Sequence, residues 1–372
     1  METMLPQALT PLEATAFDEA VLGRLRKTYA PDLEAVIERL KSLSFHYEVF
    51  EVAHRRQVER RELLFRHAVP YLLVVRGAER ETEESSEEDR GCLATLLLAH
   101  TLALTQLDYH MDGAAPPSDK TTAAVWLEPA TASAYASRMM LEAMSVADDW
   151  CGSSSSHVRS VITEVSGFVL ERMLQDTVER YDLRFLHGDN QIYLQSPTSR
   201  LMASGYWELM LRVGAHRHHL DVSAKDLVAI RRFRRLRQVV DEIADLDEDV
   251  AAGLSTLPVR FAAAAEPHGE IASLIADEWS IRRPTGDART TASTARIAGK
   301  VRASPAYARA LAVAVGLVRS LDEHIAQDQS LPLNRALRIL TDLKLAWLCE
   351  VEPATKVLMP AVPASTSWLY ER

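Results

Sequence analysis

The 372-residue chain is poor in the residues that build disulfide scaffolds and loop-rich folds. Its three cysteines, Cys92, Cys151 and Cys349, are odd in number and widely spaced, which excludes a disulfide framework and a cysteine zinc site. We expect them to be buried thiols in a reducing cytoplasm. Only 14 glycines and 16 prolines occur, while Ala, Leu, Arg and Glu are frequent. This composition favours helices over sheets and long loops.

Excess positive charge and long apolar runs are also missing. The 42 basic residues are outnumbered by 52 acidic ones, and the resulting net charge of -10 argues against a nucleic-acid partner. No apolar stretch reaches the roughly 18 residues that a transmembrane helix needs. The start METMLPQALTPLEATAFDEA is acidic and has no positively charged region, so it does not resemble a signal peptide. These features predict a cytoplasmic protein with no transmembrane segment.

What the chain does contain is helical periodicity. Apolar residues make up 47% of it and recur every three to four positions, and no long Val/Ile/Thr alternation indicates a sheet. We predict an all-α bundle of about ten helices in one domain, residues 1–372. Flexible tails are expected at about 1–20 and 352–372, with a charged loop at 79–90.

Several helices can be placed in advance. Residues 32–53 are expected to form one helix, and residues 92–112 a buried central helix that stops at Gly113. A long helix should begin after a capping residue, Ser223, and continue to about residue 250. Residues 260–350 should hold three more helical stretches, broken near Pro284 and Pro332.

Two sets of acidic residues stand at the ends of apolar helices. Asp108 and Asp112 close the central helix, and Asp241, Glu242 and Asp245 occupy the end of the long one. Two acids four residues apart are common where any helix meets water, so the first set alone indicates little. Two sets that face each other from a bundle's mouth are able to hold Mg²⁺, because this hard cation prefers oxygen ligands.

The second set lies in the segment QVVDEIADLDEDVAAGLSTLPVRFA, residues 238–262. This segment resembles the second aspartate-rich motif of trans-isoprenyl diphosphate synthases and terpene synthases, Q-x-x-D-D-x-x-D, followed by D-x-x-x-G-K-x-T-L-P. TLALTQLDYHMDG resembles their first motif, D-D-x-x-D, and GFVLERMLQD a further segment that leads to Asp176. The resemblance covers about residues 50 to 350 and is most specific at Gln238, Asp241, Asp245, Gly253, Thr256, Leu257 and Pro258.

The resemblance implies an isoprenoid synthase-type helical bundle with a deep central apolar cavity, assembled as a homodimer. It implies a prenyl diphosphate substrate and three Mg²⁺ ions at the cavity mouth. The metal ligands that it implies are Asp108, Asp112, Asp241, Glu242 and Asp245, and the four aspartates would be catalytic. The diphosphate-binding residues that it implies are Arg66, Lys120, Arg200, Arg237 and Gln238.

Departures from the family pattern bear on the reaction. Tyr109 stands where the first motif has its second aspartate, and Leu254 replaces the lysine before Thr-Leu-Pro. Few basic residues remain, whereas two diphosphates in one site need several cations to offset their repulsion. The leading prediction is therefore a Mg²⁺-dependent terpene synthase, a lyase that ionises one prenyl diphosphate and then cyclises or quenches the allylic cation. The alternatives are a trans-prenyltransferase, elongating with isopentenyl diphosphate or prenylating another acceptor, and a non-catalytic partner subunit of a prenyl synthase.

Two arginines precede the second acidic set on the same helix face. Arg234 and Arg237 stand seven and four residues before Asp241. Either they form a solvated face and an ion pair with Asp241, or Arg237 supplies positive charge to the diphosphate. Both interpretations stay open from sequence alone.

Overall fold

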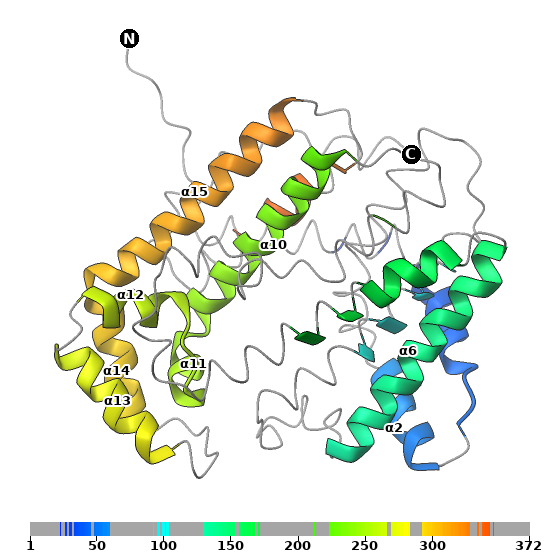
Figure 1. The fold of residues 1–372 in the computed structure, drawn as a ribbon, viewed down its shortest axis with the longest axis horizontal. Helices are drawn as coiled ribbons and strands as arrows, with labels where there is room; N and C mark the ends of the chain where they lie inside the picture. Colours follow the sequence, from blue (N-terminus) through cyan, green and yellow to red (C-terminus); the bar gives the residue numbers. More distant parts are fainter. Residues whose placement is uncertain are drawn as a thin grey trace.

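Every element of regular structure that is labelled in Figure 1 is an α-helix. In this computed structural model, the residues with described structure are 23, 27, 30, 31, 33–45, 48–59, 92, 95, 96, 99, 100, 102, 103, 129–152, 156–164, 166, 167, 170, 171, 212, 223–265, 269–282, 292–327, 333, 334, 337–342 and 345. None of these residues lies in a β-strand. The prediction of an all-α fold is confirmed.

The labelled helices form two groups that share one apolar core. On one side α2 and α6 lie together, and on the other α10 to α15 gather around the long α10–α15 pair (Figure 1). The helices are α2 (Glu48–Val58), α6 (Pro129–Cys151), α10 (Ala224–Ala244), α11 (Leu246–Ala252), α12 (Leu257–Ala265), α13 (Glu270–Arg282), α14 (Ala292–Ala303) and α15 (Pro305–Gln327).

The α10–α15 pair supports the end of the molecule that carries the second acidic set. Phe233, Leu236 and Val240 of α10 are buried, and α15 packs against both α10 and α12. Ala310 and Ala314 are buried on α15, and such small side chains let neighbouring helices approach closely. A hydrogen bond from the Arg232 guanidinium to the Ser320 carbonyl, 3.5 Å, also joins the pair.

A buried histidine joins three helices on the other side of the molecule. His54 of α2 is 3% exposed, and its Nε2 lies 2.7 Å from the Leu40 carbonyl oxygen. Because a carbonyl only accepts, Nε2 carries the proton, and Nδ1 accepts from the Tyr135 hydroxyl of α6 at 3.0 Å. Burial lowers the pKa of His54, which favours the neutral form that this arrangement requires.

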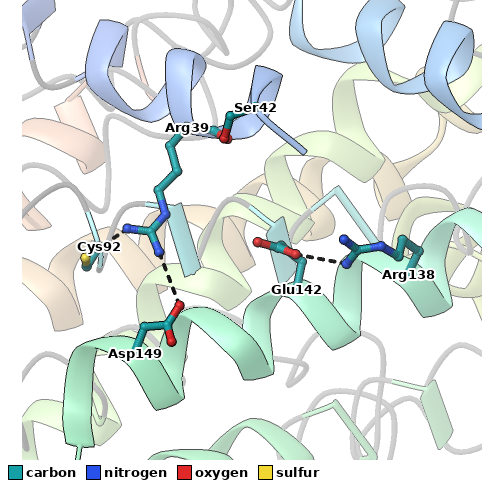
Figure 2. A network of polar contacts seen from close by, with 6 residues as sticks. All are labelled: Arg39, Ser42, Cys92, Arg138, Glu142 and Asp149. Carbon is teal, nitrogen blue, oxygen red and sulfur yellow. Dashed lines mark hydrogen bonds and ion pairs between the residues drawn. The ribbon is translucent and has the colours of Figure 1, made fainter. Parts of the chain in front are cut away.

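Figure 2 shows a network of polar contacts that includes residues of α6 and of the helix before α2. The Arg39 guanidinium reaches from the helix at residues 33–41 to the Cys92 sulfur, 3.3 Å, and to the Asp149 carboxylate of α6, 4.0 Å. On α6 itself, Arg138 pairs with Glu142 at 2.9 Å (Figure 2). The network ties the N-terminal helix to α6 and to the central segment that contains Cys92. Cys92 is a buried thiol, as expected, and the Cys151 side chain and Cys349 lie outside the described part of the chain.

The helix expected at residues 32–53 is divided in the structure. Residues 32–53 do not form one helix, because the chain turns at Ser42 and is irregular to Phe45 before α2 begins. The Arg39 carbonyl accepts from the Ser42 hydroxyl at 2.6 Å and from the Ser42 N–H at 3.2 Å, so it is satisfied where the helix ends.

The C-terminal region contains more helices than the three expected in residues 260–350. The chain breaks at Ser304, and Pro305 is the first residue of α15, a position where proline's missing N–H costs no helical hydrogen bond. Helical residues also follow α15 at 337–342. The breaks expected near Pro284 and Pro332 fall outside the described residues.

No single helix in the described part of the chain is long and apolar enough to span a membrane. The α14–α15 pair, bent by 65°, meets the length and composition criteria only as a pair. The tails at 1–20 and 352–372 and the charged loop at 79–90 lie outside the described residues, and the single-domain division stays a prediction.

Candidate functional site

The second acidic set is carried by α10, and local sequence fixes where this helix begins. Ser223 is its N-cap, as predicted: the Ser223 hydroxyl accepts from the Asp226 backbone N–H at 3.2 Å. The Asp226 carboxylate accepts in return from the Ser223 backbone N–H at 3.0 Å. This reciprocal capping box satisfies two N–H groups that otherwise lack helical partners.

The helix was expected to continue to about residue 250, but it stops at Asp245. Asp245 has φ -92° and ψ 17°, which is not helical, and α11 starts at the next residue. The Asp245 N–H still donates to the Asp241 carbonyl at 2.8 Å. The break therefore places Asp245 at the junction of two helices, one turn beyond Asp241.

Asp241 and Asp245 are the solvent-accessible acids of this set. The Asp241 side chain is 30% exposed and Asp245 is exposed. The Asp245 N–H bond to the Asp241 carbonyl puts Asp245 one turn beyond Asp241, so the two residues lie on the same side of this helix end. The Arg237 Nε lies 3.8 Å from an Asp241 carboxylate oxygen, so the expected ion pair is present. Half-exposed pairs at this separation contribute little stability, about 0–1 kcal/mol. The role of Arg237 toward a diphosphate stays a prediction.

Glu242 and Gln238 differ from these acids in being buried. Glu242 is 1% exposed and Gln238 is 9% exposed. One Glu242 carboxylate oxygen accepts from the backbone N–H of Leu257 at 2.7 Å. The other accepts from the Gln238 amide at 3.3 Å. The pair thus links α10 to the first residue of α12.

A tight turn connects α11 to α12 beside these residues. Gly253 adopts a left-handed conformation, φ 77°, and its N–H donates to the Val250 carbonyl, 3.2 Å. The next N–H, of Leu254, donates to the Asp249 carbonyl at 2.8 Å. The side chain of Leu254 is 8% exposed. Leu254 therefore puts a buried apolar side chain at the position where the family that this segment resembles has lysine.

Side chains from other helices support the turn. The Trp279 indole N–H of α13 donates to the Val250 carbonyl at 3.2 Å, and Arg302 of α14 pairs with Asp247 of α11. Two hydroxyl oxygens in the turn, those of Ser255 and Thr256, are buried without a hydrogen-bond partner. Unpaired buried hydroxyls are rare in folded proteins.

The donor set can be compared with the needs of Mg²⁺, the cofactor implied by the sequence. Asp241 and Asp245 present oxygen ligands on an open face, which suits an ion that keeps several waters. Glu242 does not fit as well, because its carboxylate is enclosed and already hydrogen-bonded. No group of three or more potential metal ligands is found among the described residues. The other predicted site residues, Asp108, Asp112, Arg66, Lys120 and Arg200, lie outside them.

The hydrogen bonds that join this region to α12 and α13 were not predicted from the sequence. The Leu257 N–H bond to Glu242 spans 15 positions, and the Trp279–Val250 bond spans 29. No local pattern signals such pairs. The turn itself had a signal, because Gly253 is typical of a helix C-terminus.

No family sequence model matches the chain, and no curated protein sequence does. Solved structures do match. A decaprenyl diphosphate synthase from Rhodobacter capsulatus is 15% identical with a TM-score of 0.66, over 88% of this chain and 98% of the other. A polyprenyl synthase from Caulobacter crescentus complexed with calcium and isoprenyl diphosphate is 16% identical, TM-score 0.63, over 87% and 97%. A geranylgeranyl pyrophosphate synthase from Lactobacillus brevis is 14% identical, TM-score 0.64, over 85% and 95%.

The chain therefore has the fold of isoprenoid synthases, as its acidic motifs predicted. The match extends over nearly the whole length of each compared protein. The expected central cavity stays a prediction.

Proposed function

We propose that this chain is a Mg²⁺-dependent prenyltransferase that binds an allylic prenyl diphosphate. The sequence pointed first to a terpene synthase and named the trans-prenyltransferase as its alternative. The structural neighbours support the alternative, because the compared proteins are prenyl and polyprenyl diphosphate synthases. The finding that supports an active site here is the open pair of carboxylates at the end of α10.

In this proposal Asp241 and Asp245 hold Mg²⁺, and Asp108 and Asp112 face them from the central helix. Bound Mg²⁺ stabilises the negative charge that develops on a departing diphosphate. Asp241 is suited to this role because its side chain is 30% exposed and its ion pair with Arg237 is long, at 3.8 Å. The calcium and isoprenyl diphosphate in the Caulobacter crescentus protein are compatible with a divalent-cation site in this fold.

Cationic groups complete the proposed diphosphate site. Arg237 stands one turn before Asp241 and is paired with it at 3.8 Å, and in this proposal it contacts the same ligand. Arg66, Lys120 and Arg200 are the further cations that the sequence implies. Gln238 is buried and donates to Glu242, so we assign it to holding Glu242 as well as to the diphosphate contact that the resemblance implies.

One observation favours the terpene synthase as a second candidate. Leu254, which replaces a lysine of the resembling family, is buried in the turn next to Gly253, where it adds no positive charge. A site with fewer cations is better matched to one diphosphate than to two. The two candidates share Mg²⁺ and the allylic substrate, and they differ in whether a second diphosphate is bound.

Product analysis separates these candidates. The pure protein is incubated with Mg²⁺ and geranyl, farnesyl or geranylgeranyl diphosphate, each with and without isopentenyl diphosphate. A longer prenyl diphosphate, formed only with isopentenyl diphosphate, supports the proposal. A hydrocarbon or alcohol from one substrate supports the terpene synthase. No product under any condition contradicts both and favours a non-catalytic partner subunit.

A further inference from the structure

The buried Glu242 carboxylate distinguishes this acidic set from a simple row of metal ligands. Adjacent helical residues point roughly 100° apart around the axis. Asp241 and Asp245 share one face, so Glu242 points away from it. Its burial confirms this direction, since Glu242 is 1% exposed while Asp245 is exposed. Glu242 therefore faces the protein interior and not the side on which Asp241 and Asp245 are open.

The contact that Glu242 makes is with the start of another helix. Its carboxylate oxygen accepts from the Leu257 N–H at 2.7 Å, and Leu257 is the first residue of α12. N–H groups in the first turn have no partner within their own helix. A carboxylate at this end also interacts favourably with the helix dipole. A hydrogen bond with a charged acceptor is stronger than a neutral one, so this contact fixes α12 relative to α10.

What the contact holds in place is the turn at residues 253–256. This turn follows directly after α11 and ends where Glu242 binds, and it carries the unpaired buried hydroxyls of Ser255 and Thr256. The Thr256 carbonyl accepts from the Arg260 N–H at 2.9 Å, so the turn is continuous with α12. Movement of the start of α12 would move this turn relative to Asp241.

We propose that Glu242 is a positioning residue, not a metal ligand. Its carboxylate holds the start of α12 and the 253–256 turn against the end of α10, the helix end that carries Asp241 and Asp245. This inference rests on the proposed function, because it concerns the Mg²⁺ site of that function. It replaces the assignment of Glu242 as a ligand, which came from the motif resemblance alone.

Two substitutions separate the roles. Glu242→Gln keeps an acceptor oxygen at the same distance for the Leu257 N–H and removes the charge, and the Gln238 amide is able to turn over to suit it. Glu242→Met keeps the volume and removes both acceptors. Asp241→Asn serves as the matched control for the loss of a metal-ligand charge. Each variant is measured for the Mg²⁺ midpoint of melting stabilisation with inorganic pyrophosphate, for turnover, and for Leu257 amide hydrogen exchange.

Glu242→Gln should leave the Mg²⁺ midpoint within about twofold of the wild type, whereas Asp241→Asn should raise it more than about tenfold. Glu242→Met should speed Leu257 exchange by about tenfold or more and lower turnover, with the Mg²⁺ midpoint unchanged. A midpoint shift in Glu242→Gln as large as in Asp241→Asn would make Glu242 a ligand and overturn the inference. Unchanged Leu257 exchange in Glu242→Met would overturn it as well.

Failure of the proposed function gives a different result. A wild-type protein with no Mg²⁺ response and no turnover contradicts the proposed function. That result also overturns the part of the inference that concerns the Mg²⁺ site. The Leu257 amide exchange rate in Glu242→Met still decides whether Glu242 holds the start of α12. If Glu242→Met does not fold, the midpoint in Glu242→Gln still decides between ligand and positioning residue.

Discussion

Acidification should destabilise the protein through one buried histidine, His100. This residue is fully buried, and its Nε2 lies 2.9 Å from the Ser166 hydroxyl oxygen. The Ser166 hydroxyl donates to the Ile162 carbonyl at 2.6 Å, so it accepts from His100 Nε2–H. The Nδ1 atom is buried with no hydrogen-bond partner. Burial lowers the pKa of His100 from 6.5 to about 4.

The sign and size of the effect follow from this pKa. The unfolded chain takes up a proton at His100 near pH 6.5, whereas the folded protein does so only near pH 4. The stability associated with the neutral histidine is therefore full above pH 6.5 and is lost as pH falls toward 4. A difference of roughly 2.5 pKa units corresponds to about 3 kcal/mol of unfolding free energy at low pH.

Urea denaturation from pH 7.5 to 4 measures this loss. His100→Leu and His100→Gln both remove the titrating group, so each serves as a reference that still contains every other titrating residue. The unfolding free energy of the wild type minus that of either variant should fall by about 3 kcal/mol across this range. A difference that stays constant with pH in both variants would refute the reasoning.

Three further substitutions test other features by urea denaturation. Tyr135→Phe removes the hydroxyl that donates to the buried Nδ1 of His54 and should cost about 1–3 kcal/mol; a cost below the experimental error would contradict the assigned tautomer. Asp342 has a pKa raised by burial from 3.8 to about 6, so its contribution to stability is full below pH 3.8 and lost as pH rises through 6. The unfolding free energy of Asp342→Asn minus that of the wild type should therefore rise by about 2–3 kcal/mol from pH 4 to pH 7. A difference that falls over this range would refute the raised pKa. Gly253→Ala should cost about 1–2 kcal/mol, because φ is 77° and alanine is strained there, although its Cβ would meet Trp279 only at 3.9 Å; an unchanged stability would show that the turn relaxes.

The parts of the fold that sequence predicted are those with local signals. Ser223 was recognised as a cap because serine before an apolar periodic segment satisfies free N–H groups, and Asp226 completes the box. The all-α architecture followed from the composition and the spacing of apolar residues. Asp241 and Asp245 were recognised as a shared face because residues four apart on a helix lie together.

The parts that were not predicted depend on contacts distant in sequence. Helix propensity continues through Asp245 and through Ser42 to Phe45, yet the chain turns there because tertiary packing overrides a weak local preference. Glu242 matches a motif position, which predicts a metal ligand by resemblance, and that prediction stays untested. The bond from the Leu257 N–H to Glu242 carries no local signal, because it forms only when α12 folds back onto α10. The first acidic set, with Asp108 and Asp112, lies outside the described residues and its placement stays a prediction.

The central claim is that the acids at the end of α10 form a Mg²⁺-dependent prenyl diphosphate site. The most direct measurement is the release of inorganic pyrophosphate from farnesyl diphosphate, with isopentenyl diphosphate present, by the wild type and by Asp241→Asn. Release should require Mg²⁺, stop with a chelator, and fall at least about 100-fold in Asp241→Asn. The Asp241→Asn melting temperature should stay within a few degrees of the wild type, since the Asp241 side chain is partly exposed. Equal release by the two proteins, or release that does not need Mg²⁺, would contradict the account.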